Sequence, residues 1–523
     1  MSTEKEYVVV VNRGVDIDAF DAELAASTGE GPIPNRAVDI ANPRLGSNRM
    51  THWMLTDEEA AELHNDPRVL SVEIPVDQRS DAKLGFRALQ DANFDKPTIL
   101  DAAKVNWGLR RCIESTNIYS NANTASSLYP YALDGTGVDI VIQDSGLQVD
   151  HPEFTDANGV SRVQQINWYT ASGLPGTQSP NHYRDFEGHG THCAGIATGK
   201  TYGWAKNAHV YSQKLNGLEG TGDAGTGISI ADAFDTIRLW HAAKTNGRPT
   251  IVNMSWGYFA QLSGNPTGGN YRGTVWSWGT DYVNNLALWQ GVGIVPPLLA
   301  GDRIFPLRVA SVDAEIDDMI DAGIHVVIAA GNDYYKGDVS TGIDYNNTAV
   351  YGGLTYYYHR GSSPHSDQAL IVGNSDTDVQ LSGGSYLDKT SESTSRGPRV
   401  TCFAPGQNII STCSNTTIFS AIAYPDDSNY KIAMINGTSM AAPQVVGVMA
   451  QHLQVTPFAS PADIKYKIEE DSKAVMYTTN LDNDYSEFAT SLMGSPNRLL
   501  YSKYGRQPTN TSGLTISGSV SLS

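Results

Sequence analysis

The segment Asn436–Pro443 (NGTSMAAP) constrains this chain most, because it places a serine between a glycine turn and an apolar helix. Residues 440–450 (MAAPQVVGVMA) predict a buried helix, in whose first turn Pro443 is tolerated. Ser439 would then lie at the positive end of the helix dipole, where charge developing on a substrate oxygen is stabilised. A serine at the start of a helix is most often only a cap. A catalytic role for Ser439 therefore requires a base and a carboxylate elsewhere in the chain.

Two upstream segments contain such groups. The run 188–195 (GHGTHCAG) puts His189 between glycines at the start of a small apolar helical stretch. The run 137–146 (GVDIVIQDSG) predicts a strand that ends at Asp144, and such a carboxylate faces the crevice where α/β proteins bind ligands. Taken singly, the histidine suits a structural role and the aspartate a turn. His189 and His192 lack the further ligands of a zinc site.

The three segments together, in the order Asp, His, Ser, resemble the subtilisin-like serine proteases (subtilases, peptidase S8), and most closely their proteinase K branch. The resemblance implies a three-layer α/β/α fold with a mostly parallel sheet and a site at the carboxyl ends of the strands. It also implies a triad of Asp144, His189 and Ser439 and no required cofactor. The matching strings are DSG at 144–146 with HPEF at 151–154, GHGTHCAG at 188–195 and GTSMAAP at 437–443.

Further strings extend the resemblance to the rest of the site. The run 326–332 (VVIAAGN) matches the strand and turn that present the oxyanion donor, a role that falls to Asn332. The two edges of the specificity pocket would pair with an extended peptide as added strands. Trp256 suits either a pocket wall or core packing. The implied substrate-binding residues are Ser255, Trp256 and Gly257 on one edge and Gly220, Thr221 and Gly222 on the other.

The chain also departs from the family pattern. Gln143 precedes Asp144 where the family has an apolar residue, so its buried amide needs partners. Thr401 stands where many relatives supply an aspartate to a structural calcium ion, which argues against that calcium site. Two long insertions, near 258–318 and 335–365, are of a length that usually indicates functional or interaction surfaces.

The first eighty residues predict a small α+β module. Its expected strands are 7–11, 52–56 and 69–76, and its expected helices are 17–26 and 57–64, the second with a capping box that begins at Thr56. The resemblance implies a propeptide that inhibits the enzyme, and an unrelated docking module is the alternative. The expected organisation is a module at 1–80, a linker and processing region at 81–105, a catalytic domain at 106–505 and a flexible Ser/Thr/Gly-rich tail at 506–523.

Composition limits the partners and the compartment. A net charge of −20 argues against nucleic-acid binding through a basic surface. No run of the sequence is long and apolar enough for a membrane span, and the N-terminus does not read as a secretory signal. The four cysteines (Cys112, Cys193, Cys402 and Cys413) suit reduced thiols, although a Cys402–Cys413 bridge stays open. We therefore expect a cytoplasmic or virus-particle-associated protein.

Two functional hypotheses follow. The first is a serine endopeptidase that acts on protein or peptide substrates, made as a self-processing zymogen with its own N-terminal module as inhibitor. The second is a structural or assembly protein, for example one associated with a virion, that retains the protease fold. In that case the insertions or the tail would contact an assembly partner.

Overall fold

The structure is a computed structural model, and it describes residues 3–26, 31–85, 106–120, 129–218, 225–278, 292–294, 303–478 and 491–505. The predicted tail at 506–523 and most of the predicted linker lie outside these residues. None of the helices among the described residues is both long enough and apolar enough to cross a membrane.

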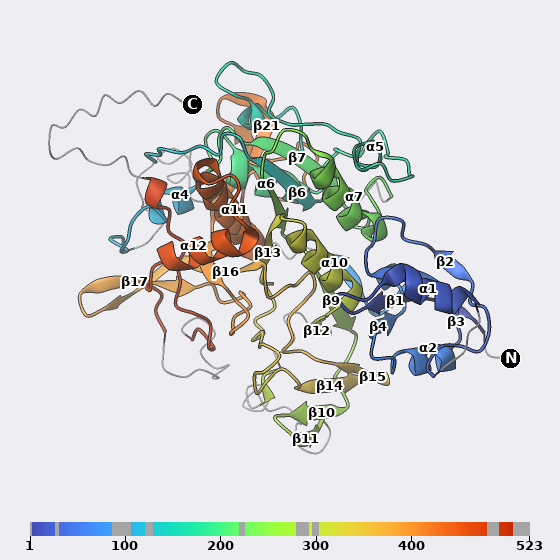
Figure 1. Cartoon of the computed structure of the whole chain (residues 1–523). Coiled ribbons are helices and arrows are strands. Elements are labelled where there is room, and N and C mark those ends of the chain that lie inside the picture. Colours follow the sequence, from blue (N-terminus) through green and yellow to red (C-terminus); the bar gives the residue numbers. More distant parts are fainter. Residues whose placement is uncertain are drawn as a thin grey trace.

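A seven-stranded sheet forms the centre of the molecule (Figure 1). Its strand order is β17-β16-β13-β8-β6-β7, and β18 also pairs with β16. All of these pairings are parallel except that of β16 with β17. The strands are β6 (Asp139–Asp144), β7 (His209–Lys214), β8 (Thr250–Met254), β13 (His325–Ala329), β16 (Leu370–Ser382), β17 (Ser385–Thr390) and β18 (Cys402–Pro405).

Helices cover both faces of this sheet because its central strands are apolar on both sides. Every residue of β6, β8 and β13 is buried, which is the pattern of a parallel sheet between two helical layers. Val141 and Val252 pack in one hydrophobic cluster with α7 (Ile230–Ala243) and α10 (Ala310–Asp321). Ile140 and Ile251 pack in another with α6 (His189–Thr198) and α11 (Thr438–Val455). The predicted three-layer α/β/α fold is confirmed.

Shorter elements complete this part of the chain. The helices are α4 (Trp107–Arg111), α5 (Trp168–Ser172) and α12 (Pro461–Asp471). A separate three-stranded sheet of order β19-β21-β20 leads directly into the segment that contains Ser439. Its strands are β19 (Ile409–Cys413), β20 (Ala421–Tyr424) and β21 (Asp427–Ile435).

The N-terminal module has its own sheet and its own core. Its four strands pair antiparallel in the order β2-β3-β1-β4. One face of the sheet packs on α1 and α2, and the other face packs on Ala314 of α10 (Figure 1). The elements are β1 (Lys5–Val11), α1 (Ile17–Ala26), β2 (Ile40–Asn42), β3 (Met50–Leu55), α2 (Asp57–Leu63) and β4 (Val69–Glu73).

The predicted elements of this module are present, with two differences. The capping box of Thr56 and Glu59 forms at the start of α2. The last strand ends at Glu73 rather than at residue 76, because Pro75 cannot continue the ladder and a short 3-10 turn begins at Val76. Strand β2 was not predicted, since its three residues are too few to show a period.

The region predicted as a polar linker begins with a strand. Lys83–Gly85 forms β5, which pairs antiparallel with β9 (Gly257–Leu262). On its other side β9 pairs with β12 (Arg303–Pro306). The linker prediction is therefore wrong at 83–85, where pairing with a distant strand gives an ordered structure to a segment without strand periodicity of its own.

The two predicted insertions fold together into one sheet of order β11-β10-β14-β15. Both side-chain oxygens of Asp344, in the second insertion, accept bonds from the guanidinium of Arg272, in the first, at 2.6 and 2.8 Å. The strands are β10 (Gly268–Tyr271), β11 (Thr274–Ser277), β14 (Thr348–Tyr351) and β15 (Leu354–Tyr356). The stretch 258–318 also contains most of α10, which belongs to the helical layer on the main sheet.

All four cysteines are free and buried. The Cys402–Cys413 bridge that the sequence left open does not form. Burial raises the pKa of both thiols to about 12. These cysteines therefore act as small apolar core residues.

A buried ion pair joins α4 to the edge of the main sheet, and we expect Asp388→Asn to be strongly destabilising. Arg111 donates to both oxygens of Asp388, at 2.9 and 2.6 Å, and the two side chains are 1% and 0% exposed. The substitution leaves a buried guanidinium without its counter-charge, at a cost of about 3–5 kcal/mol of unfolding free energy. Urea denaturation measures this loss.

Glu23→Gln is the matched control, because it removes the carboxylate of a half-exposed pair with Arg68. It should cost less than about 1 kcal/mol. Equal losses in the two variants would contradict the assignment of Arg111 and Asp388 as a structural pair.

Candidate active site

Asp144 and His189 meet at the carboxyl end of the main sheet. Asp144 ends β6, and His189 is the first residue of α6. The Nδ1 atom of His189 lies 2.8 Å from Oδ1 of Asp144, and both side chains are completely buried. The backbone N–H of Ser145 donates to the same oxygen at 2.8 Å. A carboxylate at Nδ1 places the imidazole proton there and leaves Nε2 as the basic nitrogen.

The start of α6 is held against the end of β6 by a close backbone approach. A Cβ atom on Gly190 would lie 2.2 Å from the carbonyl oxygen of Gly146, so only glycine fits at this position. The hydroxyl of Ser145 accepts from the Gly190 N–H at 2.9 Å. The glycine after the histidine therefore determines how closely the imidazole approaches Asp144.

Asp185 orients this helix start, although it was not among the predicted site residues. Its carboxylate accepts from the N–H groups of Gly188 and Thr191, at 2.8 and 2.9 Å. It also accepts from the Ser145 hydroxyl at 2.9 Å. A carboxylate just before a helix is the expected partner of its unpaired N–H groups. The acid three residues before the glycine of GHGTH was the available signal.

Ser439 lies in the first turn of α11, whose N-cap is Gly437. No side chain caps this helix, so the reading of Ser439 as a cap is wrong. The Ser439 hydroxyl donates to the carbonyl of Ser255 at 3.0 Å, and the Ser255 hydroxyl donates back to the carbonyl of Ser439 at 3.1 Å. Asn253 holds the Ser255 hydroxyl at 2.9 Å. Ser255 therefore fixes the backbone of the serine as well as lining the site.

Cys193 lies between the histidine and the serine. Its sulfur is 3.8 Å from Nδ1 of His189 and donates to the carbonyl of Ser439 at 3.3 Å. Burial, followed by the charge of Asp144, raises the pKa of this thiol well above its ordinary value. The structure thus brings together the three predicted triad residues, with Cys193 as a packing residue between them.

Asn332 reaches the same place from the loop after β13, where Gly331 has a φ of 108°. Its Oδ1 atom accepts from the N–H of Thr438 at 2.9 Å and from the Thr438 hydroxyl at 3.0 Å. Two bonds to one atom fix the plane of the amide, so its Nδ2 group points away from Thr438. Thr438, which the sequence suggested only as a cap, is the residue that orients Asn332.

A small cavity of about 30 Å³ opens beside the serine. It is lined on one side by Ser255, Trp256 and Gly257, as predicted, and also by Gly85 of β5. Trp256 is 3% exposed and packs against Phe234 and Tyr258, so it serves both as pocket wall and as core. The other lining residues are Tyr258, Phe259, Ala329, Gly331, Asn332, Asp333, Ser362, Thr438 and Ser439. The predicted opposite edge, Gly220, Thr221 and Gly222, lies outside the described residues.

The surrounding titratable groups are held neutral. Burial raises the pKa of Glu187 to about 9, assisted by the nearby charges of Asp185 and Asp144. Burial also lowers the pKa of His192 to about 3, and its Nε2 lies 3.1 Å from the carbonyl of Ala433. His192 is therefore a structural histidine.

The candidate metal ligands do not form a convincing ion site. Ligand atoms of Asp144, His189 and Cys193 lie within 4.8 Å of one another. The thiol that such a site would need in its anionic form is held protonated by burial. At the expected calcium position, the Thr401 hydroxyl accepts from the N–H of Ile371 at 3.1 Å and so joins two segments of the sheet. Thr401 offers no carboxylate to an ion.

The buried amide of Gln143 finds a partner in the next strand. Its Nε2 donates to Oε1 of Gln213 on β7 at 2.9 Å. Gln213 in turn donates to the carbonyl of Ala233 and to the hydroxyl of Thr236 on α7, both at 2.9 Å. This departure from the family pattern is thus accommodated by a hydrogen-bonded chain under the site.

The chain is similar to secreted and allergenic proteases by name. It is 27% identical over 355 residues to "Subtilisin-like serine protease Cur l 4.0101" of Cochliobolus lunatus, an alignment of 67% of this chain and 50% of that protein. It is 25% identical over 457 residues to "Extracellular serine proteinase" of Thermus sp. (strain Rt41A), covering 86% of this chain and 74% of that protein. The chain therefore spans half the length of the first of these relatives.

Among solved structures, a cold adapted subtilisin-like serine proteinase matches 76% of this chain and 99% of its own chain, with 20% identity and a TM-score of 0.44. The profile of the subtilase family, Peptidase_S8, matches residues 135–489. This match covers most of the chain and contains Asp144, His189, Asn332 and Ser439, so the chain belongs to the subtilase family.

Proposed function

We propose that this protein is a serine endopeptidase that hydrolyses peptide bonds through an acyl-enzyme intermediate and matures by cutting its own chain. The observation that carries the proposal is the buried Asp144–His189 pair beside a serine in the first turn of α11. A structural protein that merely kept the fold would not need a charged pair with no solvent exposure, because burying such a pair is costly unless it is used.

The roles follow from the geometry. Ser439 attacks the scissile carbonyl while Nε2 of His189 takes its proton, and the same nitrogen returns the proton to the leaving amine. Asp144, bonded to Nδ1, keeps the imidazole in the required tautomer and stabilises its cation. Water then releases the acyl group by the same path.

The negative oxygen of the tetrahedral intermediate would be bound by Nδ2 of Asn332 and by the backbone N–H of Ser439. Thr438 fixes the Asn332 amide before substrate arrives, so little reorganisation is needed during the reaction. The first turn of α11 adds its positive dipole end.

The structure describes a resting arrangement, because the Ser439 hydroxyl donates to Ser255 rather than to His189. Rotation about one side-chain bond would release it from this carbonyl. Hydrogen bonds of this kind often tighten only when the substrate is bound.

Self-processing is supported by the position of β5. This strand continues from the N-terminal module and pairs with β9, the strand that begins at the pocket wall. Gly85 at its end lines the cavity beside Ser439. The chain's own segment therefore lies where an extended peptide would be added to the edge of a sheet, which suits both an inhibitor and a first substrate.

The alternative of an assembly protein keeps support from one feature. The two insertions form a sheet outside the core of the fold, joined by the Arg272–Asp344 ion pair, and such a surface suits a partner. The two functions are compatible, because a processing protease can belong to an assembly.

The first prediction concerns the nucleophile. Ser439→Ala should abolish hydrolysis of a casein or peptide substrate and prevent labelling by a fluorophosphonate, since the attacking hydroxyl is lost. Ser382→Ala, on the exposed end of β16, should keep both. Full activity in the Ser439 variant would exclude this serine as the nucleophile.

The second prediction concerns the oxyanion donor. Asn332→Ala should lower kcat by roughly 10²–10³-fold with little change in KM, a magnitude that comes from subtilisin itself. Thr438→Val should lower kcat less, because it leaves the backbone N–H of residue 438 on Oδ1 of Asn332. Steady-state kinetics with one peptide substrate tests both. A change confined to KM would contradict a role in the transition state.

The third prediction is the processing site. Gly85 pairs with Gly257 in an antiparallel register, so position 87 falls opposite Ser255, whose carbonyl accepts the Ser439 hydroxyl. That position is Arg87, and Asp333 lines the cavity with a carboxylate that suits a guanidinium. Mass spectrometry of the incubated chain should find a new N-terminus at Ala88, and Ser439→Ala should remain uncut. A new N-terminus at another position would contradict this register.

A further inference from the structure

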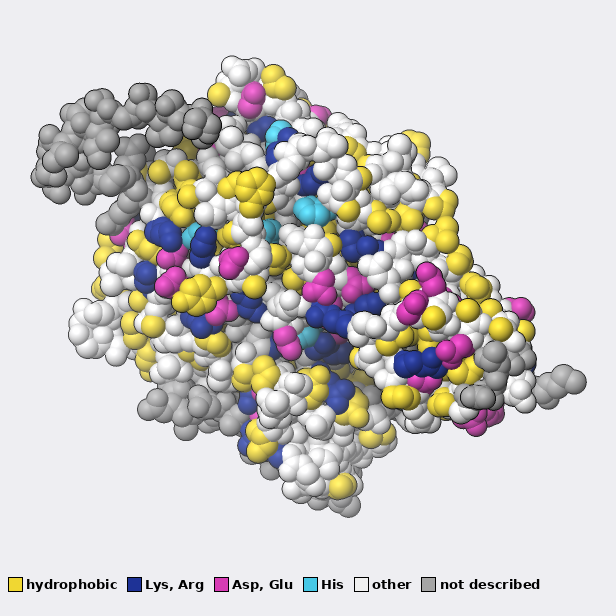
Figure 2. Space-filling model, in the orientation of Figure 1, with side chains coloured by type: hydrophobic (Ala, Val, Ile, Leu, Met, Phe, Trp, Pro, Cys, Tyr) yellow, Lys and Arg dark blue, Asp and Glu magenta, His cyan; other side chains and the backbone are white. Residues whose placement is uncertain are grey.

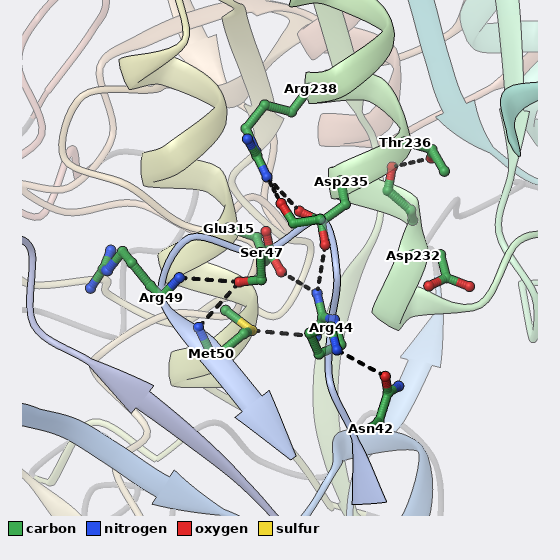
Figure 3. Close-up of polar contacts among 12 residues, drawn as sticks. Asn42, Arg44, Ser47, Arg49, Met50, Asp232, Asp235, Thr236, Arg238 and Glu315 are labelled. Carbon is green, nitrogen blue, oxygen red and sulfur yellow. Dashed lines mark hydrogen bonds and ion pairs between the residues drawn. The ribbon is translucent and has the colours of Figure 1, made fainter. Parts of the chain in front are cut away.

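One loop of the N-terminal module enters the catalytic part of the molecule between α7 and α10 (Figure 3). This loop joins β2 to β3 and carries Arg44, which is only 7% exposed. Arg44 has a φ of 45°, a conformation that residues other than glycine rarely adopt. The packing of its side chain therefore outweighs an unfavourable backbone.

The guanidinium of Arg44 lies between one carboxylate of each helix. Its Nη2 is 2.5 Å from Oε1 of Glu315 on α10 and 3.2 Å from Oδ2 of Asp235 on α7. These carboxylate side chains are 4% and 3% exposed. Its Nη1 contacts the sulfur of Met50 at 3.3 Å and Nε2 of His52 at 3.5 Å, both in the module. Asp235 and Glu315 form an acidic socket that a single arginine side chain fills.

The socket is built before the arginine reaches it. The second oxygen of Asp235 is held by Arg238 on the same helix at 2.9 Å, and Arg238 also bonds to the carbonyl of Gly46 in the entering loop. A Cβ atom on Gly46 would lie 2.9 Å from Asp235, so a glycine is needed for the loop to come this close. The catalytic part thus supplies both an acceptor for the guanidinium and a donor for the loop backbone.

Weaker charge pairs surround the socket and repeat its polarity. Arg49 lies 3.5 Å from Asp318, and Arg13, which is 47% exposed, lies 3.0 Å from Asp321. Glu73 accepts from the N–H of Ser311 at the positive end of α10 at 2.7 Å. Figure 2 shows basic and acidic side chains gathered along the seam between the module and the rest of the molecule. The module meets an acidic helix with arginines.

We propose that the α7/α10 face is a docking surface that selects its occupant by one guanidinium group, and that the N-terminal module, once separated from the chain, stays bound there through Arg44. Loss of this one side chain leaves Asp235 and Glu315 buried and facing each other, whereas loss of a rim arginine leaves only a hydrated acid. A lysine cannot replace Arg44 fully, because a compact ammonium group does not bridge two carboxylates as a planar fork does. Binding at this face does not require the proposed peptidase activity.

The test uses the full chain with Ser439→Ala, so that self-cutting cannot occur, and with a recognition sequence for a site-specific protease inserted after position 95. The folded chain is cut at that sequence, and the rate at which the module leaves is followed by size-exclusion chromatography and by a fluorophore attached to the module. Arg44→Gln should speed dissociation by roughly 100-fold, which is typical when one partner of a buried pair is removed. Arg44→Lys should fall between this variant and the parent.

Arg13→Gln is the matched control at the rim and should speed dissociation less than about 5-fold. A double-mutant cycle separates the socket from any damage to the module alone. Glu315→Gln changes only the catalytic side, and Arg44→Gln combined with Glu315→Gln should dissociate far more slowly than the product of the two single effects predicts. Dissociation of Arg44→Gln at the rate of Arg13→Gln, or independent single effects in the cycle, would overturn the proposal.

Discussion

The structure depends on the complete burial of helix α11. Its side chains are buried from Thr438 to Leu453, and it packs against α6 and against the strands β8, β13, β16 and β18. A Cβ atom on Gly447 would lie 2.2 Å from Cβ of Trp204, so the helix is fixed along its length by close contact. Gln444 adds hydrogen bonds to Asn106 and to Trp204. A helix held this firmly places its first turn, and therefore Ser439, without freedom to shift.

The site assembles where three other elements end beside that turn. β6 delivers Asp144, α6 delivers His189 and the loop after β13 delivers Asn332. Each of these side chains has a second residue that fixes it: Ser145 bonds to Asp144, Asp185 holds the start of α6, and Thr438 holds Asn332. Preorganisation of this kind is what lets fixed dipoles stabilise a developing charge. The catalytic groups are thus positioned by the packing of the whole sheet, rather than by any one loop.

The N-terminal module and the catalytic part are complementary in two different ways. Pairing of β5 with β9 uses backbone hydrogen bonds, which would accept many sequences. The insertion of Arg44 between Asp235 and Glu315 depends on a single side chain and its charge. The first contact covers the cavity beside Ser439, and the second lies on the helices behind it. Coverage of the site and recognition of the module are therefore carried by separate surfaces.

The sequence by itself determined the fold class and the identity of the triad residues. Buried strands such as IVNM before Ser255 and glycine-flanked residues such as His189 have local patterns that depend only on nearby residues. What it could not predict were contacts between distant segments. Strand β5 has no period of its own, Asp185 acts through helix N–H groups, and Arg44 lies 191 residues before its partner Asp235. Only the tertiary structure decided these, because a hydrogen bond or an ion pair across the fold leaves no mark on the sequence around either partner.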